Sequence, residues 1–207
     1  MMNLRPPMVP ALYLPLTLLG APLILASASP RRKQLLEQIN LKFEVIPSQI
    51  IENFDIELSP SDFVEYYAKK KALDVAKSHS DYFVIGADTI VVFNGNILGK
   101  PKDRYDSFRM LSSLSGNTHT VFTGVSIQHQ NHGINKTIHA TTDVTFNTLS
   151  KDDISYYINT YEPFDKAGSY GIQDWFSVCV KKIDGCFYNV MGFPLSAFYQ
   201  NFSALLK

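Results

Sequence analysis

Three observations in the sequence predict an α/β fold built around a mixed β-sheet. The chain has 207 residues, of which 45% are hydrophobic and 18% are charged, so it can bury one large core. Segments with the periodicity of strands and of helices mix along the chain without a regular strand–helix–strand alternation, which argues against a Rossmann or barrel design. No repeat of about 20–50 residues is visible, which also agrees with an α/β fold around a mixed sheet.

Charge and cysteine content exclude further classes of protein. The 19 basic residues balance the 19 acidic residues, so neither disorder nor a surface that coats nucleic acid is indicated. Any anion site must therefore be built locally. Cys179 and Cys186 are too few for a secreted disulfide framework and lack the spacing of a zinc site. We expect a cytoplasmic protein that does not bind nucleic acid.

The N-terminal residues resemble a signal sequence, but three prolines argue against this interpretation. Pro10, Pro15 and Pro22 interrupt the apolar run and break a continuous helix. No later stretch approaches the roughly 20 apolar residues that a membrane span needs, so we expect no membrane partner. The predicted organisation is an N-terminal extension over residues 1–21 and one domain over residues 22–207.

Strand, turn and helix follow one another at the start of the domain. Residues 23–26 are a short apolar run typical of a buried strand. Ser29 is a favoured N-cap and Pro30 suits the first helical position, so a helix is expected from here to Ile39. A second strand is predicted over residues 43–46.

The middle of the chain predicts a long helix and a hairpin. Ser59 opens a helix expected to run to about residue 78, and residues 82–93 form a β-branched, apolar strand. Asn94-Gly95 is the strongest short signal for a hairpin turn. The remaining elements follow from the same signals: a helix over 103–114, strands over 120–128 and 136–146, a helix over 150–159, a glycine-punctuated loop over 162–173, hairpin strands around Asp184-Gly185 and a final helix from Pro194.

The segment from Ser27 to Arg32 predicts an anion-binding site. It combines two hydroxyl groups and two guanidinium groups with the positive end of a helix dipole. Arg31 and Arg32 offer planar, bidentate donors to phosphate oxygens, although cations are unfavourable at this helix end unless an anion is present. The alternative is an ordinary capped helix with solvated arginines.

Asp88 is the candidate catalytic carboxylate, because an acid inside an apolar strand is costly unless it faces a cleft or a cation. A hairpin centred on Asn94-Gly95 places Thr89 opposite Lys100, so an ammonium group comes close to Asp88. A regular pleat would point Asp88 and Lys100 to opposite faces, so a bulge or sheet-edge geometry is required. A structural ion pair is the alternative interpretation.

Two further charged residues carry weaker signals. Lys71 interrupts an otherwise apolar helix face, where its stem can pack while its ammonium reaches water. Glu52 is a lone carboxylate after an apolar run. His129, His132 and His139 lie in and beyond a polar loop without cysteine partners, so a metal cluster is not favoured there.

The familiar nucleotide motifs are absent, but several ordered motifs resemble one family. No P-loop, dinucleotide fingerprint or nucleophile elbow occurs. From about Leu23 to the C-terminus the chain resembles the Maf family of nucleoside triphosphate pyrophosphatases. The motifs are Leu25-Ala26-Ser27-Ala28-Ser29-Pro30-Arg31-Arg32, Gly86-Ala87-Asp88-Thr89-Ile90-Val91, Gly99-Lys100-Pro101, Ser115-Gly116 with His119, the run from Glu162 to Gln173, and Gly192-Phe193-Pro194-Leu195.

This resemblance implies a fold, an activity and a set of site residues. The implied fold has two lobes around an elongated mixed sheet, with a cleft between them, and the run ending at Gln173 is similar to the branch that acts on dTTP and UTP. Cleavage between the α- and β-phosphates with Mg²⁺ or Mn²⁺ would give a nucleoside monophosphate and pyrophosphate. The implied roles are Asp88 as proton acceptor, Glu52 and Asp88 as metal ligands, Ser27, Arg31, Arg32, Lys71 and Lys100 as triphosphate ligands, and Arg31, Thr89 and Gln173 as selectors of the substrate.

Two alternatives stay open, and one departure from the family pattern bears on them. The same chemistry on another base, such as that of 7-methyl-GTP, is one alternative, and a non-catalytic nucleotide-binding regulator of cell division is the other. The family usually has a glycine-rich turn after Gln173, whereas this chain has Asp174-Trp175-Phe176-Ser177 beside the expected base site. Members of the family commonly form homodimers, so a second copy of the chain is a further expected partner.

Overall fold

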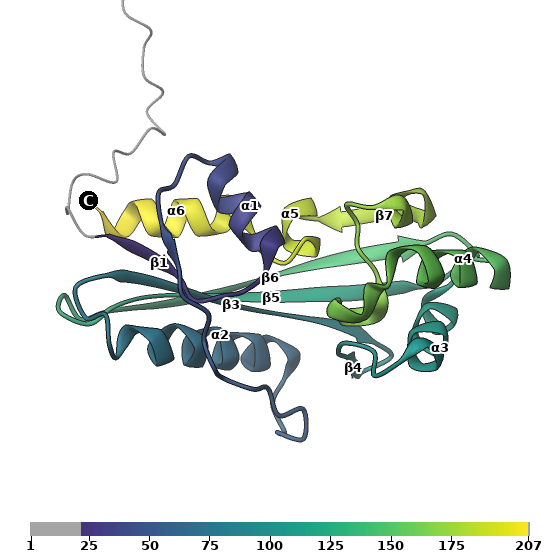
Figure 1. Ribbon diagram of the computed structural model, residues 1–207, viewed down its shortest axis with the longest axis horizontal. Coiled ribbons are helices and arrows are strands. Elements are labelled where there is room, and N and C mark those ends of the chain that lie inside the picture. Colours follow the sequence, from purple (N-terminus) through teal and green to yellow (C-terminus); the bar gives the residue numbers. More distant parts are fainter. Residues whose placement is uncertain (1–21, 207) are drawn as a thin grey trace, which may run out of the picture.

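The computed structural model describes residues 22–206 and has the predicted α/β architecture (Figure 1). The predicted N-terminal extension lies outside these residues. In chain order the elements are β1 (Leu23–Leu25), α1 (Pro30–Gln38), β2 (Glu44–Val45), α2 (Pro60–Ala76), β3 (Phe83–Phe93), β4 (Asn96–Leu98), α3 (Arg104–Leu114), β5 (Thr118–His129), β6 (Ile134–Phe146), α4 (Lys151–Tyr161), the short 3-10 helices η2 (Pro163–Asp165), η3 (Ala167–Ser169) and η4 (Trp175–Cys179), β7 (Val180–Gly185), α5 (Phe187–Val190) and α6 (Leu195–Leu205).

The predicted helix starts are confirmed by their side-chain caps. The Ser29 hydroxyl accepts a hydrogen bond from the Arg32 backbone N–H, and Ser59 caps α2 in the same way. At the start of α4, Ser150 and Asp153 cap each other's backbone N–H groups. Such caps satisfy donors that the first helical turn leaves free, each contributing about 1 kcal/mol.

The sheet is mixed, and its long strand β3 has an interrupted edge. The strand order is β2-β1-β3-β5-β6-β7, with β4 added to β3. β1 runs parallel to β2 and β3, whereas β3, β5, β6 and β7 are antiparallel neighbours. On one edge of β3, β1 pairs with Phe83–Ile85 and β4 pairs with Val91–Phe93. Residues 86–90 between these pairings therefore face an opening on that edge.

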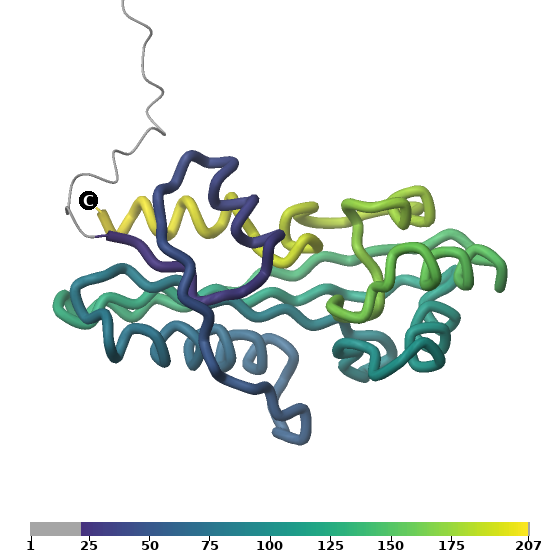
Figure 2. Tube along the Cα trace, in the orientation of Figure 1, coloured from purple at the N-terminus to yellow at the C-terminus, as the bar shows by residue number. Residues whose placement is uncertain are grey.

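Helices cover both faces of the sheet (Figure 1). α2 packs on one face at two glycines, because a Cβ atom at Gly86 would lie 2.3 Å from the Ala68 carbonyl oxygen and one at Gly124 would lie 2.2 Å from that of Val64. On the opposite face, α1 and α6 cover a core whose largest buried side chains include Phe198. The chain between α1 and α2 crosses from one face to the other past the sheet edge (Figure 2).

The predicted hairpin around Asp184-Gly185 is wrong. Residues Val180–Gly185 form a single strand, β7, which pairs with β6 and leads into the short helix α5. The physical reason lies in β6, where the Thr142 hydroxyl accepts a hydrogen bond from the Cys186 backbone N–H at 3.0 Å and donates to its carbonyl oxygen at 3.2 Å. This side chain takes the backbone groups that a returning strand would need. Within residues 22–206, no helix is long and apolar enough to cross a membrane.

Candidate active site

A cavity of about 810 Å³ lies beside the interrupted edge of β3. Seven cationic and four acidic side chains line it, so it has an excess of positive charge in a chain whose formal net charge is zero. Every site residue expected from the sequence is among the lining residues, although these residues come from distant segments. They are Ser27, Arg31, Arg32, Glu52, Lys71, Asp88, Thr89, Lys100 and Gln173.

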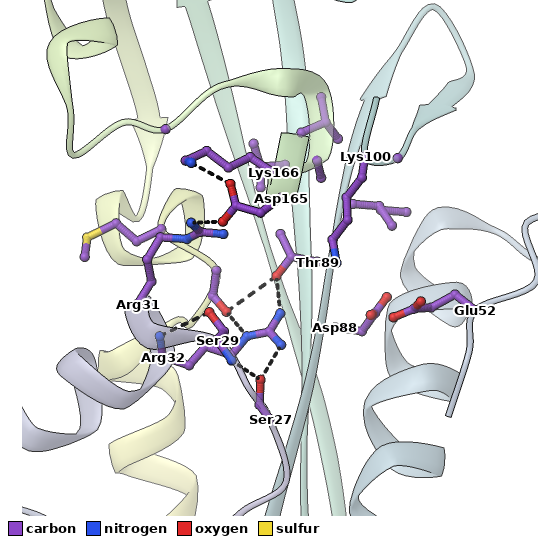
Figure 3. A pocket seen from close by; sticks show the side chains of 18 of the residues that line it. Ser27, Ser29, Arg31, Arg32, Glu52, Asp88, Thr89, Lys100, Asp165 and Lys166 are labelled. Carbon is purple, nitrogen blue, oxygen red and sulfur yellow. Dashed lines mark hydrogen bonds and ion pairs between the residues drawn. The ribbon is translucent and has the colours of Figure 1, made fainter. Parts of the chain in front are cut away.

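Consecutive residues of β3 contribute to two different walls of this cavity. Asp88 points to the face covered by α2, where it meets Lys71, and Thr89 points to the opposite face, where it meets Arg32. Alternation of side chains along a strand causes this division. The cavity therefore reaches around the open edge of the strand, and Figure 3 shows the two groups on either side of it.

On the α2 side, Lys71 links two carboxylates. Its Nζ atom donates to Asp88 Oδ1 at 2.7 Å and also forms an ion pair with Glu52 Oε1. Asp88 is 5% exposed, and its Oδ2 atom has no hydrogen-bond partner among the described residues. The charge of Lys71 explains how the strand tolerates an acid, and the free oxygen leaves Asp88 able to accept a further hydrogen bond.

The two carboxylates of this group have pKa values shifted in opposite directions. Burial raises the pKa of Asp88, and the charges of Lys71 and Arg32 offset this effect only in part. Burial also opposes ionisation of Glu52, but the hydrogen bond and charge of Lys71 outweigh it, so the pKa of Glu52 lies below its ordinary value. A pair of acids with separated pKa values is typical of sites that use one of them for proton transfer.

On the α1 side, the Arg32 guanidinium is hydrogen-bonded to several segments of the chain that form this wall of the cavity. Its Nε donates to the Gly192 carbonyl at 3.0 Å, and Nη1 donates to Ser27 Oγ at 3.1 Å and to the Ala87 carbonyl at 2.9 Å. Nη2 donates to Thr89 Oγ1 at 3.1 Å. Four of the five guanidinium donors are thus directed to protein acceptors, and one is left for a ligand.

Arg31 forms an ion pair that the sequence analysis did not predict. Its Nη1 donates to Asp165 Oδ2 at 3.0 Å, and Lys166 Nζ donates to Asp165 Oδ1 at 2.6 Å. Burial raises the pKa of Asp165, but the hydrogen bonds from Lys166 and Arg31 outweigh it and bring that pKa below its ordinary value. Asp165 and Lys166 belong to the motif from Glu162 to Gln173, in which the sequence alone gives these two residues no role.

Lys100 reaches the cavity because the strand pairing stops before it. The last pair of the β3–β4 ladder joins Val91 and Leu98, so Lys100 lies beyond the regular pleat. This is the sheet-edge geometry that the sequence required for Asp88 and Lys100 to share a site. Figure 3 shows Lys100 extending toward Asp88 and Thr89. Lys102, Asp106 and Arg109 near the start of α3 also line the cavity and were missed, since only a local rise in charge marks them.

The donor set suits a hard divalent ion that takes part of its coordination from a ligand. Within residues 22–206 no group of three or more His, Cys, Asp or Glu side chains is placed to hold a metal. Glu52 and Asp88 supply oxygen atoms, and one of these, Asp88 Oδ2, is buried without a partner. Mg²⁺ is commonly held by one or two carboxylates together with substrate phosphates and water, so these residues fit such an ion.

The histidines take structural positions. His119 Nε2 is hydrogen-bonded to the Tyr170 hydroxyl at 2.9 Å, and burial lowers the pKa of His119 to about 4. The His139 Nδ1 atom is hydrogen-bonded to Glu65 Oε1 at 2.6 Å, and the His129 ring packs against Phe83 and His132.

Comparison with known proteins assigns the family. The family model of the Maf-like proteins matches residues 22–205. A dTTP/UTP pyrophosphatase of Halalkalibacterium halodurans is 53% identical over 175 residues, covering 84% of this chain and 91% of that protein. The dTTP/UTP pyrophosphatases of Bacillus velezensis and Thermosipho africanus are each 49% identical over 174 residues, covering 84% of this chain and 91% and 88% of those proteins.

A solved structure supports the fold independently. A HAM1 protein from Coxiella burnetii matches with a TM-score of 0.50 and 12% identity, covering 89% of this chain and 99% of that one. At this identity the match concerns the fold alone. The family model and the relatives at 49–53% identity show that this chain belongs to the Maf-like protein family.

Proposed function

We propose that this protein is a nucleoside triphosphate pyrophosphatase that hydrolyses dTTP and UTP to the nucleoside monophosphate and pyrophosphate. The observation that carries the proposal is Asp88, a buried carboxylate with a free oxygen atom, in a cavity lined by seven cations. The names of the relatives from three different organisms agree with this activity and with these substrates.

The cationic side chains suit a triphosphate. Lys100, Lys102, Arg31 and Lys166 all line the cavity, and the last two both contact Asp165. Such groups would neutralise the phosphate oxygens and hold the chain of phosphates in line, which stabilises charge that moves to the leaving group during cleavage. Ser27 and Arg32 are hydrogen-bonded to each other, so they would contribute mainly by holding the α1 side of the cavity in place.

Asp88 would act as the proton acceptor. A water molecule that donates a hydrogen bond to the free Oδ2 atom would attack the α-phosphorus, and its proton would pass to Asp88. The bond between the α-phosphorus and the oxygen that bridges it to the β-phosphorus would break, and pyrophosphate would leave with that oxygen. A carboxylate with a raised pKa is a stronger base than an ordinary aspartate, which favours this transfer. Lys71 would hold the other oxygen, Oδ1, and thereby fix the direction of the carboxylate.

Glu52 and Asp88 are the residues that would hold a divalent cation, Mg²⁺ or Mn²⁺. When bound, the ion would supply Lewis-acid neutralisation of the phosphoryl oxygens. Lys71 now occupies the space between the two carboxylates and balances their charge. The Lys71 ammonium has three donors, of which two go to these carboxylates, so the third would be available to the phosphates, as the family resemblance implies.

Base selection would fall to Gln173, with Arg31 and Thr89 lining the same cavity. The carboxamide of Gln173 can both donate to and accept from the edge of a pyrimidine ring. We further propose a cytoplasmic location, which is supported by two cysteines that are both free thiols. The proposed partners are the nucleotide, which the cationic lining of the cavity supports, and a second copy of the chain, which only the family resemblance supports.

A turnover panel tests the proposed function. The purified protein would be given dTTP, UTP, CTP, GTP and 7-methyl-GTP in turn, with Mg²⁺ or Mn²⁺, and the released phosphate species would be identified. We expect pyrophosphate, with dTTP and UTP as the best substrates. Release of single phosphate would contradict the bond that is cleaved, and preference for a purine triphosphate would contradict the substrate assignment.

A further inference from the structure

One hydroxyl group anchors the backbone on both sides of Gln173. The Tyr157 hydroxyl accepts a hydrogen bond from the Gly171 backbone N–H at 2.9 Å and donates to Asp174 Oδ2 at 3.0 Å. The other carboxylate oxygen of Asp174 accepts from the Phe176 backbone N–H at 3.0 Å, which begins η4. The segment that carries Gln173 is therefore tied to α4 two residues before and one residue after this side chain.

This anchor is buried and closely fitted. Tyr157 is 0% exposed, and its ring packs against Phe176 with the centroids 4.7 Å apart. A Cβ atom at Gly171 would lie 2.6 Å from Asp174 Oδ2 and 2.9 Å from Lys166 Cε. Glycine at this position thus allows the Asp174 carboxylate to reach Tyr157 and the Lys166 side chain to lie across the loop on its way to Asp165. A fully buried, hydrogen-bonded group of this kind fixes the backbone more firmly than a solvent-exposed contact.

Neighbouring anchors fix the residues before Gly171 but do not reach Gln173. Ser107 and Ser169 are hydrogen-bonded through their hydroxyls at 2.5 Å, and His119 holds the Tyr170 hydroxyl. The Gln173 side chain is itself exposed and makes no hydrogen bond to another residue of the described part of the chain. Its position therefore follows from its backbone, which Tyr157 holds through Gly171 and Asp174 and which the buried Ile172 side chain also fixes.

A glutamine needs such positioning to distinguish uracil or thymine from cytosine. Rotation by half a turn exchanges the carboxamide oxygen and nitrogen, so a loosely held glutamine can satisfy either donor and acceptor pattern. Discrimination arises when the wrong base leaves a polar group unpaired in the complex, which requires that the Gln173 backbone hold the carboxamide at one distance and angle from the ring edge.

We propose that Tyr157 is a positioning residue for base selection, acting through Gly171 and Asp174 to hold Gln173 against the pyrimidine edge. This inference rests on the proposed function, in which Gln173 contacts the base. Tyr157 touches neither the substrate nor the reacting atoms, so its removal should alter which base is accepted more than the chemistry of cleavage.

The experiment compares the ratio of kcat/KM for UTP and for CTP in four proteins: the unaltered chain, Tyr157→Phe, Gln173→Ala and the double variant. We expect Tyr157→Phe to lower the ratio by about 3- to 10-fold, the size of one lost hydrogen bond. The change should lie mainly in KM for UTP. In the double variant, Tyr157→Phe should add little to the effect of Gln173→Ala, because both act on one contact.

Tyr161→Phe is the matched control, since it also removes a tyrosine hydroxyl from α4 and its ring stacks on Tyr157 with the centroids 5.3 Å apart. This control should leave the UTP to CTP ratio unchanged. Asp174→Asn is the second test of the same anchor, because it keeps an acceptor for the Phe176 N–H but replaces the acceptor for Tyr157. Circular dichroism and melting temperature would establish that each variant is folded.

The outcomes separate the inference from the function on which it rests. If Gln173→Ala lowers the ratio but folded Tyr157→Phe and Asp174→Asn do not, the positioning role is overturned while the proposed function stands. Independent, additive effects of Tyr157→Phe and Gln173→Ala would also overturn it. If Gln173→Ala itself leaves the ratio unchanged, the proposed contact between Gln173 and the base is wrong.

Discussion

The two walls of the cavity use charge in different ways. On the α2 side, a lysine holds two carboxylates and one acid is buried with a raised pKa and a free oxygen. On the α1 side, an arginine directs most of its donors to protein oxygens and stiffens the wall. The α2 side therefore supplies the candidate proton acceptor, and the α1 side holds the backbone and side chains of the cavity in a fixed geometry. One strand supplies both because Asp88 and Thr89 are neighbours that point apart.

The largest expected effect is on the reactive wall. Asp88→Asn removes the proton acceptor while keeping nearly the same volume, so kcat should fall about 10²- to 10⁴-fold. The affinity for nucleotide should change little, because the cations remain. Single-turnover pyrophosphate release and equilibrium nucleotide binding would measure the two quantities separately. Unchanged turnover would reject Asp88 as the base.

A smaller loss is expected when the structural wall is disturbed. Arg32→Lys keeps the charge but cannot reproduce the hydrogen bonds to Ser27, Ala87, Thr89 and Gly192. We expect kcat/KM to fall about 10- to 100-fold, together with a lower melting temperature, since bonds from a charged donor contribute about 1.5–3 kcal/mol each. Lys33→Arg, a change at an exposed position of α1, is a suitable control. A normal kcat/KM in folded Arg32→Lys would show that the positive charge is sufficient at this position and that the hydrogen bonds are not required.

The dependence of the rate on pH tests the raised pKa of Asp88 on the α2 side of the cavity. Asp88 is active as a base only when ionised, and burial raises its pKa, so the rate should fall with decreasing pH before an ordinary aspartate would be protonated. Lys71→Met removes a cation that lowers this pKa and should shift the acid limb to higher pH. The measurement is kcat/KM against pH for both proteins. A shift to lower pH would mean that another group controls the limb.

The smallest effect is expected at the rim of the α1 side. Asp165 holds Arg31 and Lys166, the same cations that a polyphosphate would contact. Asp165→Asn should therefore strengthen pyrophosphate binding about 2- to 5-fold, the size of an exposed ion pair. Asp184→Asn removes an acid that is paired with Lys182 at 2.9 Å and does not line the cavity, which makes it a matched control. Weaker binding in Asp165→Asn would show that the carboxylate supports the ligand rather than competing with it.

The sequence predicts those parts of the molecule that depend on local chemistry. Ser29, Ser59 and Ser150 cap helices where the pattern of cap and apolar residues indicates, and Asn94-Gly95 makes its hairpin turn. At Asp184-Gly185 the same kind of turn signal fails, because the Thr142 hydroxyl on another strand captures the backbone that follows. A turn signal describes the local chain and contains no information about such distant partners.

The candidate site also has features that local sequence patterns do not predict. Every expected residue lines one cavity, but the sequence does not indicate that Arg32 is directed mainly to protein atoms or that Asp165 pairs with Arg31 from 134 residues away. Tyr157 carries no motif at all and becomes visible only when the loop around Gln173 is folded against α4. Long-range contacts of this kind depend on how the sheet and helices pack, which no short pattern records.

Because Asp88 and Thr89 point to opposite faces and have different roles, catalytic activity depends on the register of β3. A slip of β3 by one residue would exchange the two side chains, turning the acid toward the arginine and the hydroxyl toward the lysine. Gly86 and Gly124 oppose such a slip, because any other residue beneath α2 would collide with its backbone. A misfolded copy with shifted strands would therefore be catalytically silent even if its overall shape were preserved.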